Sequence, residues 1–228
     1  MKHQVLLVSA AEYKGLGEIL PGRSDVPLTV TGRAHAHIVS SSLSATRILS
    51  VGHGPAPRAR VTAQIIAYPH DLKPYLIPDL DDLDVGHWQG RDFNSLKQDP
   101  EWIQWQQHAD SSRIPGGESI ADARSRVMGV LNNLPHQDGI TVLATHSNII
   151  RAVIASILEC PFSSAMRLDI GPASLTYLHW KDSHWQVLGI NLRNGHGLVG
   201  ATNHGRWPEN RDAIGEHWAP GSETRLGV

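Results

Sequence analysis

The sequence is short of several features that would place it in a specialised class of protein. Its only cysteine, Cys160, excludes an intrachain disulfide and suits a reducing compartment. Neither sign of charge dominates, with 20 Lys and Arg against 22 Asp and Glu, which argues against a nucleic-acid partner. No apolar run reaches the roughly 18 residues that a membrane span needs, and the N-terminal stretch turns polar too soon for a signal peptide. We therefore expect a cytoplasmic protein with no membrane partner.

What the sequence does contain is an alternation of predicted strands and helices. Short apolar runs predict strands at residues 4–9, 47–51, 140–145, 174–180 and 185–192. Helices are expected over residues 29–44, 57–67, 119–134 and 147–158, where capping residues, an N-terminal proline or an apolar stripe favour them. This alternation predicts an α/β fold, a three-layer αβα sandwich around a mostly parallel central sheet.

The 228 residues suffice for one domain with an extension. We expect the α/β domain to span residues 1–197. Within it, residues 68–118 are rich in Pro, Asp and Trp and predict an irregular cap or insert with short helices. Residues 198–228 show little periodicity and are expected to form a C-terminal extension.

The sharpest local pattern is T-H-S-N-I-I-R-A-V at residues 145–153. A predicted strand ends there in His146, where the next helix begins, and ligands of α/β proteins bind at the carboxyl ends of strands. The amides of Ser147 and Asn148 at the start of that helix suit an anion, and His146 suits donation to an anion or proton transfer. The alternative is a histidine that merely bonds a nearby carbonyl.

Two further stretches point to the same edge of the sheet. Arg58 follows the second strand, and its guanidinium suits an oxyanion, although most first-turn arginines lie at the surface. Residues 80–90, L-D-D-L-D-V-G-H-W-Q-G, hold three carboxylates without the glycine pattern of a calcium loop. General acid–base chemistry by one of them is the functional interpretation, and a solvated acidic loop is the alternative. The spacing of the histidines specifies no zinc site.

Taken in order, these segments resemble the motifs of the histidine phosphatase superfamily, which has the phosphoglycerate mutase-like fold, over roughly residues 4–197. Five motifs carry the resemblance: Gly22 with Asp25-x-Pro27-Leu28-Thr29-x-x-Gly32, Arg58-Ala59-x-x-Thr62-Ala63, Leu80-x-Asp82-x-x-x-Gly86-x-Trp88-x-Gly90, Pro115-Gly116-Gly117-Glu118-Ser119, and Thr145-His146-Ser147-Asn148-x-Ile150-Arg151-Ala152. The resemblance implies that Arg58 is the second phosphate-binding arginine of the family, His146 its second active-site histidine, and Asp82 the acid that protonates the leaving group.

The first strand departs from the family's pattern. In the family this strand ends in Arg-His, where the arginine binds phosphate and the histidine is the nucleophile. The corresponding residues here are Ser9 and Ala10, followed by Ala11 and Glu12. Because a methyl group cannot accept a phosphoryl group, phosphohistidine chemistry through residue 10 is excluded for this chain.

Three hypotheses follow. The chain is an enzyme repurposed for acid–base chemistry (hydrolysis, elimination or isomerisation) on a small anionic or polar metabolite, or a pseudoenzyme that binds a ligand or partner, or a phosphomonoester phosphatase whose nucleophilic histidine Ala10 has replaced. We expect His146 and Asp82 to be catalytic, and no metal or cofactor to be involved. A homodimer is left open. The candidate residues for binding the anion or substrate are Arg58, Ser9, Glu12, Arg23, His53, His87 and Ser147.

Overall fold

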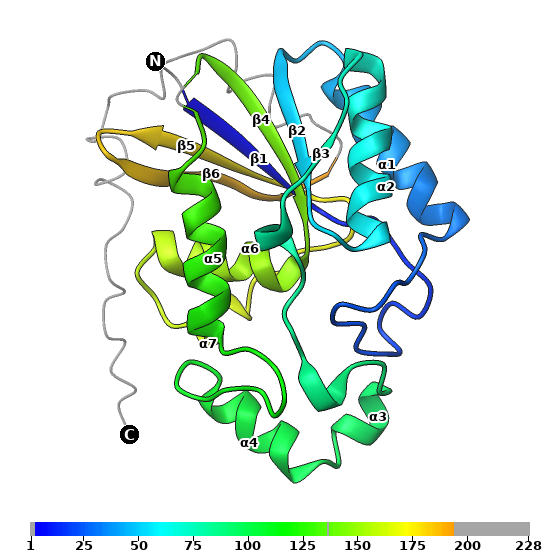
Figure 1. The fold of residues 1–228 in the computed structure, drawn as a ribbon, viewed down its shortest axis with the longest axis vertical. Helices are drawn as coiled ribbons and strands as arrows, with labels where there is room; N and C mark the ends of the chain where they lie inside the picture. Colours follow the sequence, from blue (N-terminus) through cyan, green and yellow to red (C-terminus); the bar gives the residue numbers. More distant parts are fainter. Residues whose placement is uncertain (1–2, 136, 194–228) are drawn as a thin grey trace, which may run out of the picture. The chain divides into compact units, whose positions relative to one another are not determined.

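Six strands form the central sheet of the computed structural model, which describes residues 3–135 and 137–193 (Figure 1). The strands are β1 (His3–Ser9), β2 (Ile48–His53), β3 (Tyr75–Leu76), β4 (Gly139–Thr145), β5 (Leu175–Lys181) and β6 (His184–Leu192). Their order is β3-β2-β4-β1-β5-β6. The first four pair in parallel, whereas β5 and β6 are antiparallel to their neighbours, so the sheet is mixed.

The described α-helices are α1 (Val30–Leu43), α2 (Pro57–Ala67), α3 (Phe93–Leu96), α4 (Pro100–His108), α5 (Ile120–Asn132), α6 (Ser147–Ile157) and α7 (Phe162–Ala165). Four of the described helices, α1, α3, α4 and α5, begin at a residue whose side chain caps them. Thr29 accepts a hydrogen bond from the Gly32 amide at the start of α1, and Ser119 forms a capping box with Asp122 at the start of α5. The predicted α/β fold is therefore confirmed. The expected C-terminal extension, residues 198–228, lies outside the described residues.

Two layers of helices cover the sheet. Alternate side chains of a strand point to opposite faces. Val5 and Leu7 of β1 belong to the large apolar cluster that also contains the buried residues of α5 and α6. Leu6 and Val8 are equally buried but lie outside that cluster, which places them on the other face. That face is covered by α1 and α2, which pack against each other, and α2 also packs against β2 and β4.

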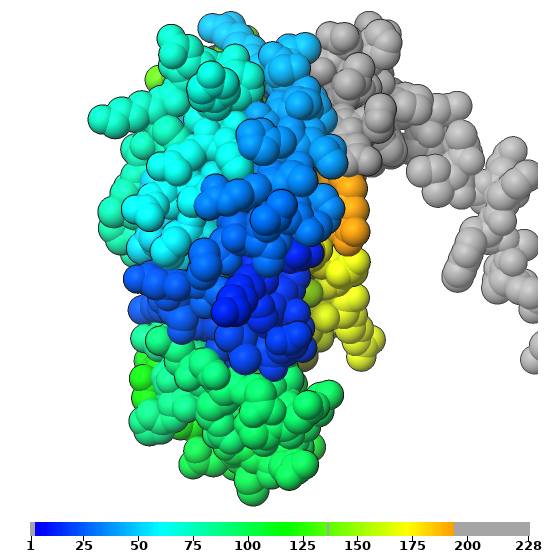
Figure 2. Space-filling model, turned by 90° about the vertical axis from the view of Figure 1, so that its right-hand side faces the viewer, coloured from blue at the N-terminus to red at the C-terminus, as the bar shows by residue number. Residues whose placement is uncertain are grey.

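The predicted cap region, residues 68–118, consists mainly of short helices and loops and packs against the core. It contains β3, α3, α4 and the 3-10 helices η1 (Tyr68–His70), η2 (Pro78–Leu80) and η3 (Gly86–Trp88). The backbone of residues 18–20 exchanges hydrogen bonds with that of residues 90–93. In Figure 2 the segment after β1, in dark blue, accordingly lies directly against the green cap segment. None of the described helices has the length and apolar character needed to cross a bilayer.

The carboxyl ends of β1, β4 and β2 meet at one edge of the sheet. The Ala10 amide donates to the Thr145 carbonyl over 2.8 Å, and the Gly54 amide donates to the Ala144 carbonyl over 3.0 Å. The Thr145 hydroxyl donates to the Leu80 carbonyl over 2.7 Å, which brings residues 80–84 to the same edge. A Cβ on Gly54 would stand 2.5 Å from that carbonyl oxygen, so glycine is required there for this close approach.

Candidate active site

Arg58 lies in the first turn of α2, directly after Pro57, and its side chain is fully buried. Its Nη1 donates to the Ser24 carbonyl over 2.8 Å, and its Nη2 donates to the Gly22 carbonyl over 2.5 Å and to Asp82 Oδ2 over 2.9 Å. The ring of Tyr13 lies over the guanidinium, with its centroid 5.2 Å from Cζ. The charge of Arg58 is thus already neutralised by Asp82 within the protein.

Asp82 is held from several sides. Its Oδ1 accepts from the Leu83 amide over 2.8 Å, while Oδ2 faces both Arg58 and His146. Arg126 secures the backbone by donating to the carbonyls of residues 79, 81 and 82, and its guanidinium also pairs with Glu118. This clamp fixes the position of the Asp82 carboxylate at the edge of the sheet.

His146 is the N-cap residue of α6 and is only 4% exposed. Burial lowers its pKa to about 4, although the Asp82 carboxylate acts in the opposite direction. The imidazole is therefore neutral at pH 7. Its Nδ1 lies 3.5 Å from Asp82 Oδ2. Its Nε2 is buried and has no hydrogen-bond partner among the described residues.

Ser9 ends β1 and Ala10 follows it, and neither supplies a histidine or a cation at this edge of the sheet. Ala10 is 5% exposed, and its amide donates a hydrogen bond to the Thr145 carbonyl of β4. Ser9 is 4% exposed, and its backbone bonds to that of residues 173 and 174 on the β5 side. Neither residue lines the large cavity described below.

Two of the residues expected to bind an anion have other partners. Glu12 accepts a hydrogen bond of 2.6 Å from the Thr29 hydroxyl, which ties the loop after β1 to the start of α1. Arg23 forms ion pairs with Asp81, Asp84 and Glu118 at distances of 3.2–3.6 Å. Three carboxylates therefore surround the guanidinium of Arg23, which links residues 81–84 to Glu118 in this structure.

The remaining candidates separate in space. His53 ends β2 and is buried, with its Nδ1 2.7 Å from the Gly54 carbonyl oxygen. His87 is exposed on η3, where its ring lies against Gly116, and it does not line the cavity. Ser147 does line the cavity. Within the described part of the chain, no three His, Cys, Asp or Glu side chains are grouped so as to hold a metal ion.

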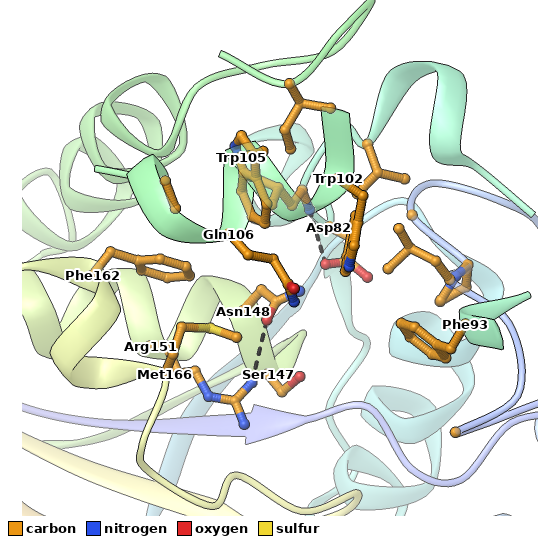
Figure 3. Close-up of a pocket in the computed structure, with 18 of the residues that line it drawn as sticks. Asp82, Phe93, Trp102, Trp105, Gln106, Ser147, Asn148, Arg151, Phe162 and Met166 are labelled. Atoms are coloured by element: carbon orange, nitrogen blue, oxygen red, sulfur yellow. Dashed lines mark hydrogen bonds between the residues drawn. The ribbon is translucent and has the colours of Figure 1, made fainter. Parts of the chain in front are cut away.

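A cavity of about 600 Å³ opens beside Asp82, between the cap region and α6 (Figure 3). Its wall is mostly apolar, with Trp102 and Phe93 on one side of the view and Phe162 and Met166 on the other. Arg58, His146 and Ala10 do not line it. The lining residues are Tyr13, Leu16, Gly17, Leu20, Pro21, Gly22, Asp82, Leu83, Val85, Phe93, Lys97, Trp102, Trp105, Gln106, Ala109, Ile114, Ser147, Asn148, Arg151, Phe162, Ser163 and Met166.

Sequence reasoning missed three residues that shape this site. Tyr13 covers Arg58, and burial, reinforced by the Asp82 carboxylate, raises its pKa to about 12, so its hydroxyl stays protonated. Arg126 clamps the Asp82 segment, and Arg151 lines the cavity. Arg151 was within reach of sequence reasoning, because it lies four residues after Ser147 on a predicted helix and therefore on the same face. No local sequence pattern identifies Tyr13 or Arg126 as residues of the site.

The family of the chain is established by comparison with known proteins. Residues 10–193 match the histidine phosphatase superfamily (branch 1), and the chain belongs to that superfamily. Among its curated relatives is a probable phosphoglycerate mutase, GpmB, of Yersinia enterocolitica, which is 29% identical over 177 residues that span 75% of this chain and 81% of the relative.

Solved structures share the fold at lower sequence identity. A mycobacterial glucosyl-3-phosphoglycerate phosphatase is 22% identical with a TM-score of 0.73, over 84% of this chain and 99% of its own. The α-ribazole phosphatase of Shigella flexneri is 20% identical with a TM-score of 0.73, over 83% and 96%. A His-to-Ala mutant of phosphoserine phosphatase from Entamoeba histolytica, in complex with phosphoserine, is 23% identical with a TM-score of 0.71, over 86% and 99%. These relatives are phosphatases and mutases by name.

Proposed function

We propose that this chain is an enzyme of the superfamily that performs acid–base chemistry, such as a hydrolysis, elimination or isomerisation, without a phosphorylated intermediate. Its substrate is a small polar or weakly anionic molecule with an apolar part. The observation that carries the proposal is the neutral His146, whose buried Nε2 lacks a partner among the described residues and whose Nδ1 faces Asp82.

This arrangement suits a general base. We infer that the imidazole proton sits on Nδ1, because that nitrogen faces the carboxylate oxygen. Nε2 then carries the free lone pair that can remove a proton from water or from the substrate. Asp82 orients the ring and also lines the cavity, so its carboxylate is placed to contact a ligand there.

The charges around residue 10 argue against a phosphomonoester substrate. Arg58 contributes one positive charge, Asp82 contributes one negative charge, and His146 is neutral at pH 7. A phosphate dianion would meet no net positive charge there, and Ser9 offers no guanidinium for a bidentate contact. A substrate with less negative charge is the better match.

A ligand-binding protein without turnover is the second candidate, and one observation favours it. Neither Arg58 nor His146 lines the cavity, so a ligand could occupy the cavity without reaching Nε2. His146→Gln separates the two functions. For an enzyme, turnover in a screen of small metabolites falls by about 10²-fold or more, the usual contribution of a general base, while binding persists. His37→Gln, which removes an exposed histidine outside the cavity lining, is the control. If no substrate is found whose turnover depends on His146, the enzyme proposal is wrong.

The replaced-nucleophile hypothesis is tested with an aryl phosphate. The phosphoserine phosphatase mutant noted above shows that a His-to-Ala chain of this fold can hold a phosphomonoester. We expect Ala10→His to remain inactive, because residue 9 still supplies no cation, and Ser9→Arg/Ala10→His to gain measurable hydrolysis. Rapid hydrolysis by Ala10→His alone would instead identify the chain as a phosphatase that lacks its nucleophile.

A further inference from the structure

The ionised side chains that line the cavity are Asp82, Lys97 and Arg151. Asp82 is already compensated by Arg58, which lies outside the lining. No ion pair within the described residues involves Lys97 or Arg151. The cavity therefore carries two positive charges that form no ion pair within the described residues, against a mostly apolar wall. This charge lies apart from the centre at residue 10, which is neutral overall.

Arg151 is held in place by neutral groups only. Its Nε and Nη2 donate to the Leu168 carbonyl over 3.1 and 3.0 Å, and its Nη1 donates to Asn148 Oδ1 over 3.2 Å. A guanidinium has five N–H groups, so one on Nη1 and one on Nη2 have no assigned partner within the described residues. The nearby Asp169 is 78% exposed and pairs with Arg193. Partial burial lowers the pKa of Arg151, because the charged form loses hydration, although the Asp169 carboxylate acts in the opposite direction.

The groups around Arg151 favour an anion with an apolar body. Ser147, Asn148 and Arg151 come from the first turns of α6, whose N-terminal end carries a partial positive charge. Gln106 extends from α4 across the cavity in their direction (Figure 3). Lys97, at the end of α3, supplies the second charge from the cap side. The opposite wall is formed by Trp102 and Phe93, which suit a flat ring.

We propose that Arg151, aided by Lys97, is a binding site for the carboxylate of a ligand whose aromatic or branched apolar body lies against Trp102 and Phe93. The two free N–H groups of Arg151 match the two oxygens of a carboxylate. This proposal deepens the proposed function, on which it rests for the existence of a small-molecule ligand, and assigns the class of ligand. It places recognition of the anion on α6 and the cap rather than on Arg58.

The test compares an acid with its uncharged isostere. Calorimetry measures binding of indole-3-propionate and 3-phenylpropionate, and of the corresponding amides, to the full chain and its variants. We expect each acid to bind about tenfold more tightly than its amide, the usual value of a charge-assisted bidentate contact. Arg151→Gln removes that preference. Lys97→Gln, at an exposed position, reduces that preference about threefold, because Lys97 supplies a more distant charge.

Arg124→Gln is the matched control, because Arg124 is also half-buried and bonded only to neutral groups, Ser156 and the Ala155 carbonyl, but lies outside the cavity. The Arg124→Gln variant should bind each acid more tightly than its amide by the same factor as the original chain does. The proposal is overturned if neither acid binds, or if acid and amide bind with equal affinity. It is also overturned if the preference for the acid is unchanged in both Arg151→Gln and Lys97→Gln, or if equimolar inorganic phosphate displaces the acids. Binding is measured also in His146→Gln, so that the anion site can be confirmed even if the proposed chemistry fails.

Discussion

A histidine buried in its neutral form makes the stability of the fold depend on pH. The pKa of His146 is lowered from 6.5 to about 4, so between these values the unfolded chain binds a proton that the folded chain does not. Stability is therefore highest above pH 6.5 and falls as the pH drops toward 4. The difference corresponds to about 3 kcal/mol when the full window is crossed.

We predict that His146→Gln flattens this acid dependence. Urea midpoints at pH 7.5 and pH 5 should lie closer together in the variant than in the original chain, because the variant has no proton to take up at this position. His37→Gln removes an exposed histidine of α1 and should leave the difference between midpoints unchanged. If the urea midpoint changed equally between pH 7.5 and pH 5 in the original chain and in His146→Gln, the imidazole would not be held neutral by burial.

At the scale of the elements, Gly54 and Gly129 differ in whether the structure leaves room for a side chain. Gly54 follows β2, and a Cβ there would stand 2.5 Å from the Leu80 carbonyl oxygen. That carbonyl also accepts from Thr145, so it cannot retreat without moving the segment that carries Asp82. Gly129 lies within α5, and a Cβ there would meet nothing within 4 Å.

We predict that Gly54→Ala is destabilising by about 2 kcal/mol and shifts residues 80–84, because backbone must move to accept the methyl group. Gly129→Ala should stabilise the chain by about 0.5–1 kcal/mol through helix propensity. Thermal unfolding of both variants measures the difference. A neutral Gly54→Ala would show that the contact between the end of β2 and Leu80 is not needed to position Asp82.

The elements were largely predictable because their signals are local. Thr29, Pro57 and Ser119 begin helices as their capping chemistry predicts, and the apolar runs give five of the six strands. The exposed two-residue strand β3 has no such signal. The convergence of Arg58, Asp82 and His146 followed from the ends of parallel strands and from the family motifs. The contact of Tyr13 with Arg58 and the ion pairs of Arg23 depend on loop conformations that a local sequence pattern does not predict.

For the described molecule as a whole, the cap shares one apolar cluster with the core. Trp88 is 1% exposed, and its ring centroid lies 5.0 Å from that of Trp102 and 5.7 Å from that of Trp105, in edge-to-face geometry. The same cluster continues into α5, α6 and β1. Because the wall of the cavity is built from this shared cluster, the cap should not open as an independent unit.

We therefore predict that cap and core unfold together. Urea transitions followed by tryptophan fluorescence, to which Trp88, Trp102 and Trp105 of the cap contribute beside the tryptophans of β5 and β6, should coincide with those followed by far-UV circular dichroism. Trp88→Ala should lower the stability of the whole molecule by about 3–5 kcal/mol, the usual cost of removing a large buried ring. Tyr68→Ala, at a side chain that is 85% exposed, is the control and should change it by less than about 0.5 kcal/mol. If the fluorescence transition preceded the dichroism transition, the cap would be a separately folding lid, and the cavity would be a gap that ligands enter by local unfolding.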